Sequence, residues 1–181
     1  LAQGYKDVKD LSVYAKFKIV GFDNAYFLAW TTTPWTLPGN VALAVGANID
    51  YVEVKVGTDI FVVAKERVEN LFEAGTYEII AEHKGSEMLG MQYEPLYPYL
   101  KNIISANKES NSEAEKMNKA YKVYMADFVT TTDGTGIVHT AVMYGADDFL
   151  LGTQVGLPKF HLVNDDGSFK NDMDFLSGRF V

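Results

Sequence analysis

Cysteine is absent from the 181 residues of this chain. Its absence excludes disulfides, thiolate nucleophiles and cysteine-based zinc sites. Long apolar runs are missing too, and no stretch approaches the roughly 20 consecutive apolar residues that a membrane-spanning helix needs. The first residues do not have the pattern of a secretory signal peptide. We therefore expect an intracellular, cytoplasmic protein without a membrane partner.

Positive charge is scarce as well. The chain has 16 Lys and Arg against 24 Asp and Glu, which gives a net charge of −8. Proteins that hold nucleic acid by themselves usually present a basic face, because counterion release supplies most of the non-specific affinity. We expect this chain to bind RNA poorly alone. If it acts on RNA, a terminal nucleotide must be presented to it, or a partner domain must hold the rest.

The composition that remains is that of a folded domain. A hydrophobic fraction of 48% and an aromatic fraction of 13% exclude disorder for the chain as a whole. The length suits one core, so we expect residues 1–181 to form a single domain. The chain begins with Leu1 instead of methionine, and we expect it to be a piece of a longer protein.

Hydrophobic periodicity indicates many short strands and few helices. We expect strands at residues 13–20, 25–32, 41–45, 51–56, 60–64, 76–81 and 121–126. Helical spacing predicts helices at residues 65–74, with Gly75 as the stop, and at residues 146–155. Residues 105–120 are polar and mixed in charge, which predicts an exposed insertion or surface helix. The expected fold is mixed α+β, mainly antiparallel β and barrel-like, with small peripheral helices.

Two polar segments stand out from this background. The first is residues 30–40 (WTTTPWTLPGN), in which Thr31, Thr32 and Thr33 leave an apolar strand and meet two prolines. Threonine runs are common in strands, but the prolines fix φ and make the segment a rigid, directed turn. The second is residues 133–140 (DGTGIVHT), whose two glycines allow a ligand or another backbone to approach closely. Asp148 lies nine positions after His139.

These segments resemble the editing (connective peptide 1) domains of class I aminoacyl-tRNA synthetases, and most closely those of the isoleucyl branch. The string from Thr31 to Asn40 is similar to the isoleucyl pattern without a break. Valyl and leucyl editing domains resemble Thr-Thr-Arg-Pro here, with arginine in place of Thr33. The string GTGIVHT around His139 is also similar to the isoleucyl pattern, whereas valyl domains have a lysine after the equivalent strand.

The resemblance implies a role for each site residue. Thr31, Thr32 and Thr33 would hold the ribose, the ester carbonyl and the attacking water, since hydroxyls donate and accept. Trp35 and Asn40 complete the substrate-binding set, with Asn40 closing the threonine-rich loop.

His139 would line the pocket for the amino-acid side chain. Whether it also acts as a base is left open by the sequence. Asp148 would pair with the substrate's α-ammonium group through a charge-assisted hydrogen bond. The alternative for a carboxylate at this place is simple complementation of a helix dipole, worth about 0.3–1 kcal/mol, and Asp147 suits that role.

Three features depart from the full synthetase pattern. Val142 stands where the family usually has proline, which loosens this loop. Residues 116–119 (KMNK) match the Lys-Met-Ser-Lys-Ser loop poorly, and no His-Ile-Gly-His-type motif occurs. We therefore expect the synthetic active site to lie outside this chain.

The implied function is hydrolytic proofreading. The domain would deacylate valine wrongly attached to tRNA(Ile), with valyl-adenylate as a further candidate substrate. Its partners would be the 3′ end of aminoacylated tRNA(Ile), the valine moiety and the remaining domains of the parent isoleucine–tRNA ligase. We expect water to attack the ester directly, without metal or cofactor. The alternatives are a valyl-type domain that clears Thr-tRNA(Val), and a catalytically silent domain that binds tRNA ends.

Overall fold

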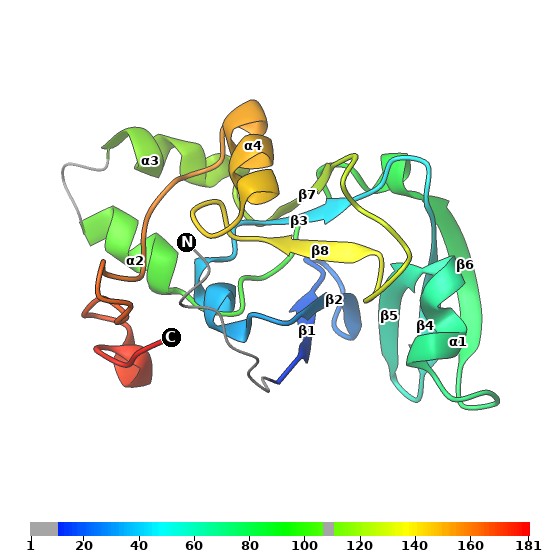
Figure 1. Cartoon of the computed structure of the whole chain (residues 1–181). Helices are drawn as coiled ribbons and strands as arrows, with labels where there is room; N and C mark the ends of the chain where they lie inside the picture. Colours follow the sequence, from blue (N-terminus) through cyan, green and yellow to red (C-terminus); the bar gives the residue numbers. More distant parts are fainter. Residues whose placement is uncertain (1–10, 107–110) are drawn as a thin grey trace, which may run out of the picture.

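The computed structural model describes residues 11–106 and 111–181, whose strands form two sheets (Figure 1). The strands, in chain order, are β1 (Val13–Lys18), β2 (Ala25–Thr31), β3 (Ala42–Val45), β4 (Asp50–Val56), β5 (Asp59–Ala64), β6 (Glu78–Lys84), β7 (Lys122–Met125) and β8 (Ile137–Thr140). The larger sheet has the order β1-β2-β5-β4-β6, and the smaller has the order β7-β3-β8. Strand β2 of the larger sheet contacts β8 of the smaller one.

The helices are short and lie around the sheets. The α-helices are α1 (Val68–Leu71), α2 (Tyr99–Ala106), α3 (Asn111–Lys116) and α4 (Ala146–Val155). The 3₁₀ helices are η1 (Pro34–Gly39), η2 (Lys65–Arg67), η3 (Gly85–Met88), η5 (Met117–Lys119) and η6 (Asp174–Leu176). In Figure 1, α4 lies above β3 and β8, while α1 lies beside β4 and β5.

The predicted fold class is confirmed. Among the strands of the described residues, four pairs are antiparallel and two, β2–β5 and β3–β7, are parallel. The strands do not close into one barrel within the described ranges, because each sheet keeps its own edges. The main core lies between the sheets and includes Phe17, Phe27, Leu43, Tyr51 and Ile137.

One of the two predicted helices is confirmed, and the other is shorter than predicted. Helix α4 has the expected bounds and ends at Gly156, whose φ of +76° suits a left-handed cap. The helix expected over residues 65–74 is instead η2 followed by α1, which ends at Leu71. Phe72 is already extended and its ring stacks on Phe61 at a centroid distance of 5.9 Å. Stacking over the sheet therefore draws Phe72 out of the helix.

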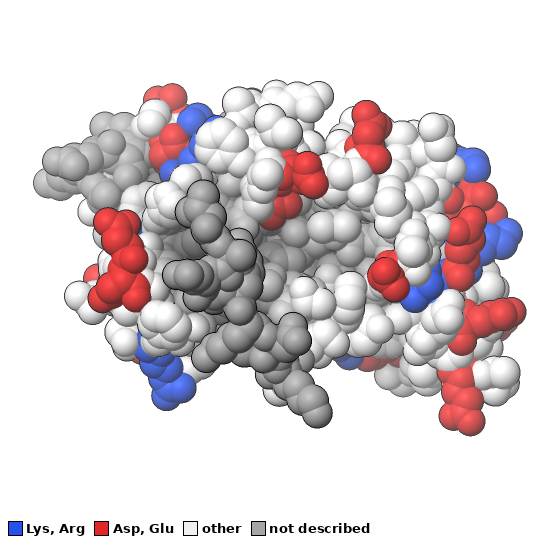
Figure 2. Space-filling view, viewed as in Figure 1, with Lys and Arg blue, Asp and Glu red and all other residues white. Residues whose placement is uncertain are grey.

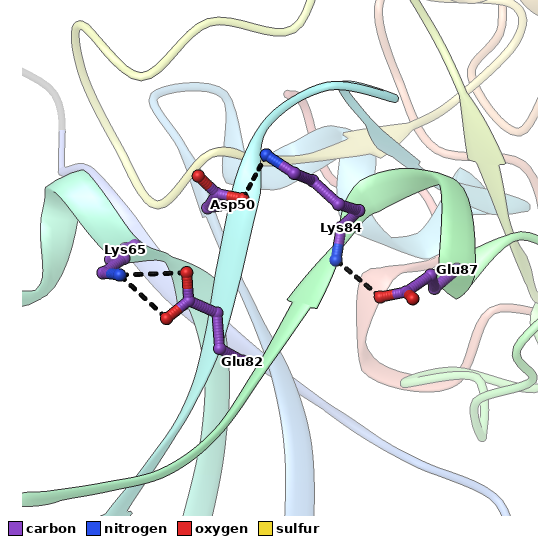
Figure 3. Close-up of polar contacts among 5 residues, drawn as sticks. All are labelled: Asp50, Lys65, Glu82, Lys84 and Glu87. Carbon is purple, nitrogen blue, oxygen red and sulfur yellow. Dashed lines mark hydrogen bonds and ion pairs between the residues drawn. The ribbon is translucent and has the colours of Figure 1, made fainter.

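Edge strand β6 carries exposed charged residues that are paired to its neighbours (Figure 3). Lys65 Nζ lies 2.9 and 2.8 Å from the two carboxylate oxygens of Glu82. Lys84 pairs with Asp50, and its backbone N–H donates to Glu87 Oε2 at 2.7 Å. Such exposed pairs contribute only about 0–1 kcal/mol each, but charge on an edge strand discourages pairing with another sheet.

The segment at residues 105–120 is described only in part, because residues 107–110 lie outside the described ranges. Its remainder includes the end of α2, then α3 and η5. Lys116 pairs with Glu113 within α3, and Lys119 Nζ donates to Val155 O at the end of α4. That this segment is an insertion stays a prediction, as does the single-domain assignment. No helix in the described ranges is long and apolar enough to cross a bilayer.

Candidate functional site

A cavity of about 410 Å³ lies where the end of β2 meets β8. Its lining residues are Trp30, Thr31, Thr32, Thr33, Thr36, Phe128, Thr130, Asp133, Gly134, Thr135, Gly136, Ile137, Val138, His139, Tyr144, Gly145 and Asp148. The structure thus brings both polar segments of the sequence to one site. We call residues 30–36 the threonine wall and residues 128–136 the loop wall.

The threonine wall is held by short-range hydrogen bonds. The Thr33 N–H donates to Thr31 Oγ1 at 3.1 Å, and the Thr31 and Thr33 hydroxyl oxygens lie 3.4 Å apart. Thr36 Oγ1 donates to Thr33 O at 2.8 Å. Pro34 begins η1, where a missing N–H costs nothing. The rigid turn predicted from the prolines is therefore a 3₁₀ helix.

His139 is placed by β8, where it pairs with Leu43 of β3 and is only 7% exposed. Its Nε2 lies 2.9 Å from Thr36 Oγ1. Because that hydroxyl donates its single hydrogen to Thr33 O, Nε2 must carry the ring proton and donate it to Thr36 Oγ1. Nδ1 is then an acceptor, and it is buried without a partner among the described residues.

Burial determines the charge of His139. Desolvation lowers the pKa of the imidazole from 6.5 to about 4, because the cationic form loses its hydration. The ring is therefore neutral near pH 7. The ring lines the cavity without a positive charge, and its Nδ1 lone pair is buried.

Asp148 lies in the first turn of α4, and its Oδ2 accepts a hydrogen bond from the Ala141 N–H at 3.0 Å. Burial raises the pKa of this carboxyl, the Ala141 N–H opposes the shift, and the charge of Asp147 adds to it. Asp147 itself is exposed. A half-buried carboxylate at a cavity gains from a cationic partner, which would offset its desolvation.

Trp35 and Asn40 do not line the cavity. The Trp35 ring meets Tyr144 edge-on at 5.2 Å between centroids. Asn40 is buried, donates to Ala42 O at 2.9 Å and accepts from Tyr93 Oη at 2.6 Å. Trp35 thus contacts a residue of the cavity lining, whereas the partners of Asn40 lie outside it, and binding of substrate by either residue stays a prediction.

The chain aligns over all or nearly all of its length with isoleucine–tRNA ligases. It is 43% identical over 181 residues to isoleucine–tRNA ligase 2 of Bacillus cereus, and 46% identical over 181 residues to the isoleucine–tRNA ligase of Clostridium acetobutylicum. The ligase of Clostridium tetani is 50% identical over 169 residues, or 93% of the chain. The chain belongs to the isoleucyl-tRNA synthetase family. It spans only 15–16% of the length of these relatives. No family model matches it.

Solved structures show the fold. A leucyl-tRNA synthetase CP1 domain (GlLeuRS-CP1) has a TM-score of 0.62 and 19% identity, over 80% of this chain and 60% of that one. The editing domain of the P. knowlesi cytosolic leucyl-tRNA synthetase has a TM-score of 0.54 and 13% identity, over 82% of this chain and 64% of that one. The fold of this isoleucyl-tRNA synthetase segment is thus the fold of synthetase editing domains.

The altered loop after β8 is well held in this isoleucyl-tRNA synthetase segment. Val142 is buried and packs so closely on α4 that a Cβ at Gly152 would lie 2.6 Å from it. Tyr144 Oη accepts the N–H groups of Leu162 and Val163 at 2.6 and 3.2 Å. Packing and hydrogen bonds therefore supply the stiffness expected to be lost without the proline.

Several cavity residues were given no individual role from the sequence. Trp30, Thr36, Asp133 and Thr135 lie within the two polar segments, whereas Phe128, Thr130, Tyr144 and Gly145 lie outside them. Thr36 lies inside the first motif, and its role depends on a partner 103 positions away. Thr130 precedes the second motif, and no local pattern distinguishes it. Within the described residues, no three His, Asp or Glu side chains cluster as a metal site would require. The absence of metal and cofactor stays a prediction.

Proposed function

We propose that this chain is a hydrolytic proofreading domain that deacylates Val-tRNA(Ile), with valyl-adenylate as a further substrate. One observation carries the proposal. Hydroxyls, a neutral histidine and a half-buried carboxylate meet in a single cavity of about 410 Å³, in a chain that aligns over its length with isoleucine–tRNA ligases. The proposed partners are the 3′ end of charged tRNA(Ile) and the rest of a parent ligase. The proposed place of action is the cytoplasm, where such ligases charge tRNA.

The need for such a domain is physical. A pocket built for isoleucine cannot strongly reject valine, and isoleucyl-tRNA synthetase is the standard illustration, with one methylene worth only about 1–3 kcal/mol. A second, smaller pocket that hydrolyses whatever fits it multiplies the discrimination. In this proposal the buried ring of His139 forms the steric limit, because it is locked by Thr36 and cannot yield. Valine enters, and isoleucine is refused.

The proposed chemistry is attack by water on the aminoacyl ester. Asp148 pairs with the substrate ammonium and so fixes the ester in place. The threonine wall supplies hydroxyls to orient the water and the carbonyl oxygen. With a pKa of about 4, His139 is a poor general base near pH 7.

The face seen in Figure 2 fits a domain that needs help to hold RNA. Acidic side chains are spread over the described surface, and Lys and Arg appear there only as small separate patches. With a net charge of −8, the chain should contact little of the tRNA beyond its terminal nucleotide, because basic residues supply most backbone affinity.

Deacylation assays with Val-, Thr- and Ile-charged tRNA test the proposal. We expect hydrolysis of valyl ester and little of isoleucyl ester. A preference for threonyl ester would instead favour a valyl-type domain, and binding of tRNA ends without hydrolysis would favour a silent domain. His139→Ala should raise the ratio of isoleucyl to valyl hydrolysis, because it removes the steric limit. An unchanged ratio with two slower rates would contradict that role.

Substitution of Asp148 tests the proposed pairing with the substrate ammonium group most directly. Asp148→Ala should lower kcat/KM for valyl-tRNA by about ten- to a hundredfold, as expected for losing the charged partner of an ammonium group. Asp148→Asn is the matched control, because it can still accept the Ala141 N–H while lacking the charge. An active Asn variant would show that Asp148 serves the loop instead of the substrate.

A further inference from the structure

The loop wall of the cavity is held from a distant element, η2. The Arg67 Nε donates to Gly134 O at 3.0 Å, and its Nη1 donates to Thr132 O at 3.1 Å. One planar guanidinium thus binds two carbonyls of the same loop. Because its donors have a fixed fork geometry, this contact sets the orientation of the loop as well as its position.

Neighbours of Arg67 extend the attachment along the loop. Glu66 accepts a hydrogen bond from the Thr131 hydroxyl. The Ala64 N–H, at the end of β5, donates to Thr135 O at 2.8 Å. Gly136 lies against Ala64 so tightly that an added Cβ would be 2.3 Å from the Ala64 Cβ. Ala64, Glu66 and Arg67 therefore hold the loop wall, with contacts to Thr131, Thr132, Gly134, Thr135 and Gly136.

The loop wall has few bonds of its own to replace these. Val129 N–H reaches Ala126 O at a long 3.4 Å, and the Thr135 hydroxyl bonds only to the Ile137 backbone. Within the described residues, the Arg67 guanidinium makes no ion pair with a carboxylate. Its two hydrogen bonds described above both go to carbonyls of the loop wall. The position of Thr130 and Asp133 beside the cavity thus depends on η2, whereas Thr135 and Gly136 are held by Ala64 at the end of β5 and by the Tyr51 hydroxyl of β4.

We propose that Arg67, assisted by Glu66, is a positioning residue that sets the width of the cavity and so the size of the acyl group it accepts. This inference rests on the proposed editing function. Arg67 does not line the cavity, so it acts through the loop and touches no substrate. Loss of the two Arg67 hydrogen bonds lets the loop wall move away from the threonine wall. The wider cavity then discriminates less between valine and isoleucine.

The test compares three variants of the 181-residue chain. Arg67→Ala removes the fork, and Arg67→Lys keeps the charge but cannot bind two carbonyls as a rigid plane. Lys65→Ala is the matched control, because it alters the same η2 helix but breaks only the exposed pair with Glu82 on β6 (Figure 3). Each variant is assayed with Val- and Ile-charged tRNA at two salt concentrations. Amide hydrogen exchange is followed at Ala64 and Ile137.

Arg67→Ala should lower kcat for valyl-tRNA by on the order of tenfold, since small displacements around a site are costly. It should also raise the ratio of isoleucyl to valyl hydrolysis and speed exchange at Ala64. The kcat, the hydrolysis ratio and the exchange rate of Arg67→Lys should lie between those of Arg67→Ala and the parent. Those of Lys65→Ala should equal the parent's.

Three results would overturn the proposal. The first is parental kcat and selectivity in Arg67→Lys, and the second is a loss in Lys65→Ala as large as that in Arg67→Ala. The third is a salt-dependent rise in KM with kcat and selectivity unchanged, which would mean that Arg67 contacts RNA phosphate. If the parent chain hydrolyses none of the charged tRNAs, the proposed function fails by itself. Amide exchange then decides the positioning role, and unchanged exchange at Ala64 in Arg67→Ala would refute it. Should Arg67→Ala not fold, Arg67→Lys carries the same comparison.

Discussion

Hydrogen bonds between residues two or three positions apart hold the threonine wall, whereas the loop wall depends on Arg67, which lies 65 and 67 positions from the residues it binds. The first wall is held mainly by these local bonds, in addition to the pairing of β2 with β1 and the contact of Thr36 with His139. The second exists only once the larger sheet has formed and brought η2 beside it. One side of the cavity is thus local in origin, and the other is tertiary.

The difference matters for function, because the two walls enclose one acyl group. A locally encoded wall is suited to chemistry, which needs hydroxyls at fixed positions. A wall attached through long-range contacts can be adjusted by residues outside the cavity without touching the reacting groups. We therefore expect substitutions in the threonine wall to change rate, and substitutions under the loop wall to change selectivity and stability.

The largest effect should come from Gly136→Ala, which breaks the loop wall. The new Cβ would meet the Ala64 Cβ, and φ of +75° is strained for alanine. Together, overpacking and strain should lower the free energy of unfolding by about 3–5 kcal/mol. Gly57→Ala is the matched control, since it has a similar φ of +60° with open space around it. Urea denaturation of both variants measures the difference, and equal losses would contradict the close packing.

A smaller effect concerns His139, which lies beside the threonine wall. Its pKa is about 4 when folded, against about 6.5 when unfolded. The unfolded chain therefore binds more protons between these values, and stability should fall as pH drops from about 6.5 to 4, by at most about 3 kcal/mol. Below pH 4 this contribution is constant. The raised pKa of Asp148 acts in the opposite sense at the acidic end of the range.

The measurement is urea unfolding of the parent and of His139→Gln at pH 7.5 and pH 4.5. The difference between the pH dependences of their free energies of unfolding gives the contribution of His139, because both proteins have the same carboxylates. Parallel pH profiles would show that His139 is not desolvated as the structure indicates.

The smallest effect should come from Thr36→Val, which alters the threonine wall and nothing under the loop wall. The substitution removes the hydroxyl that joins His139 to Thr33 O. It should cost about 1–2 kcal/mol of stability, because two hydrogen bonds are lost and the buried His139 Nε2–H is left unpaired. Hydrolysis of valyl-tRNA should slow, while amide exchange at Ala64 stays unchanged. Faster exchange at Ala64 would mean that the two walls are not independent.

Sequence reasoning predicted the local features well. The positions of seven strands and the bounds of α4 follow from periodicity and capping. That both polar segments belong to one site was implied by the resemblance to synthetase editing domains. It failed for residues 72–74, because Phe72 stacks on Phe61 over the sheet and leaves the helical pattern. It also missed Thr36 and Arg67. Each has an ordinary local pattern, and its partner lies far along the chain.

The sequence by itself determined which chemical groups are present and how residues 30–40 are shaped, since proline φ values and side-chain bonds over two or three residues act before any sheet forms. It also determined the two glycines of the loop, of which Gly136 allows the close approach to Ala64 and Gly134 the close approach to Trp30. Only the tertiary structure decided that His139 is neutral, that its Nδ1 is unpaired and that Arg67 holds the loop wall. These properties depend on burial and on contacts that close loops of many residues, and their entropy cost is met only by the assembled core.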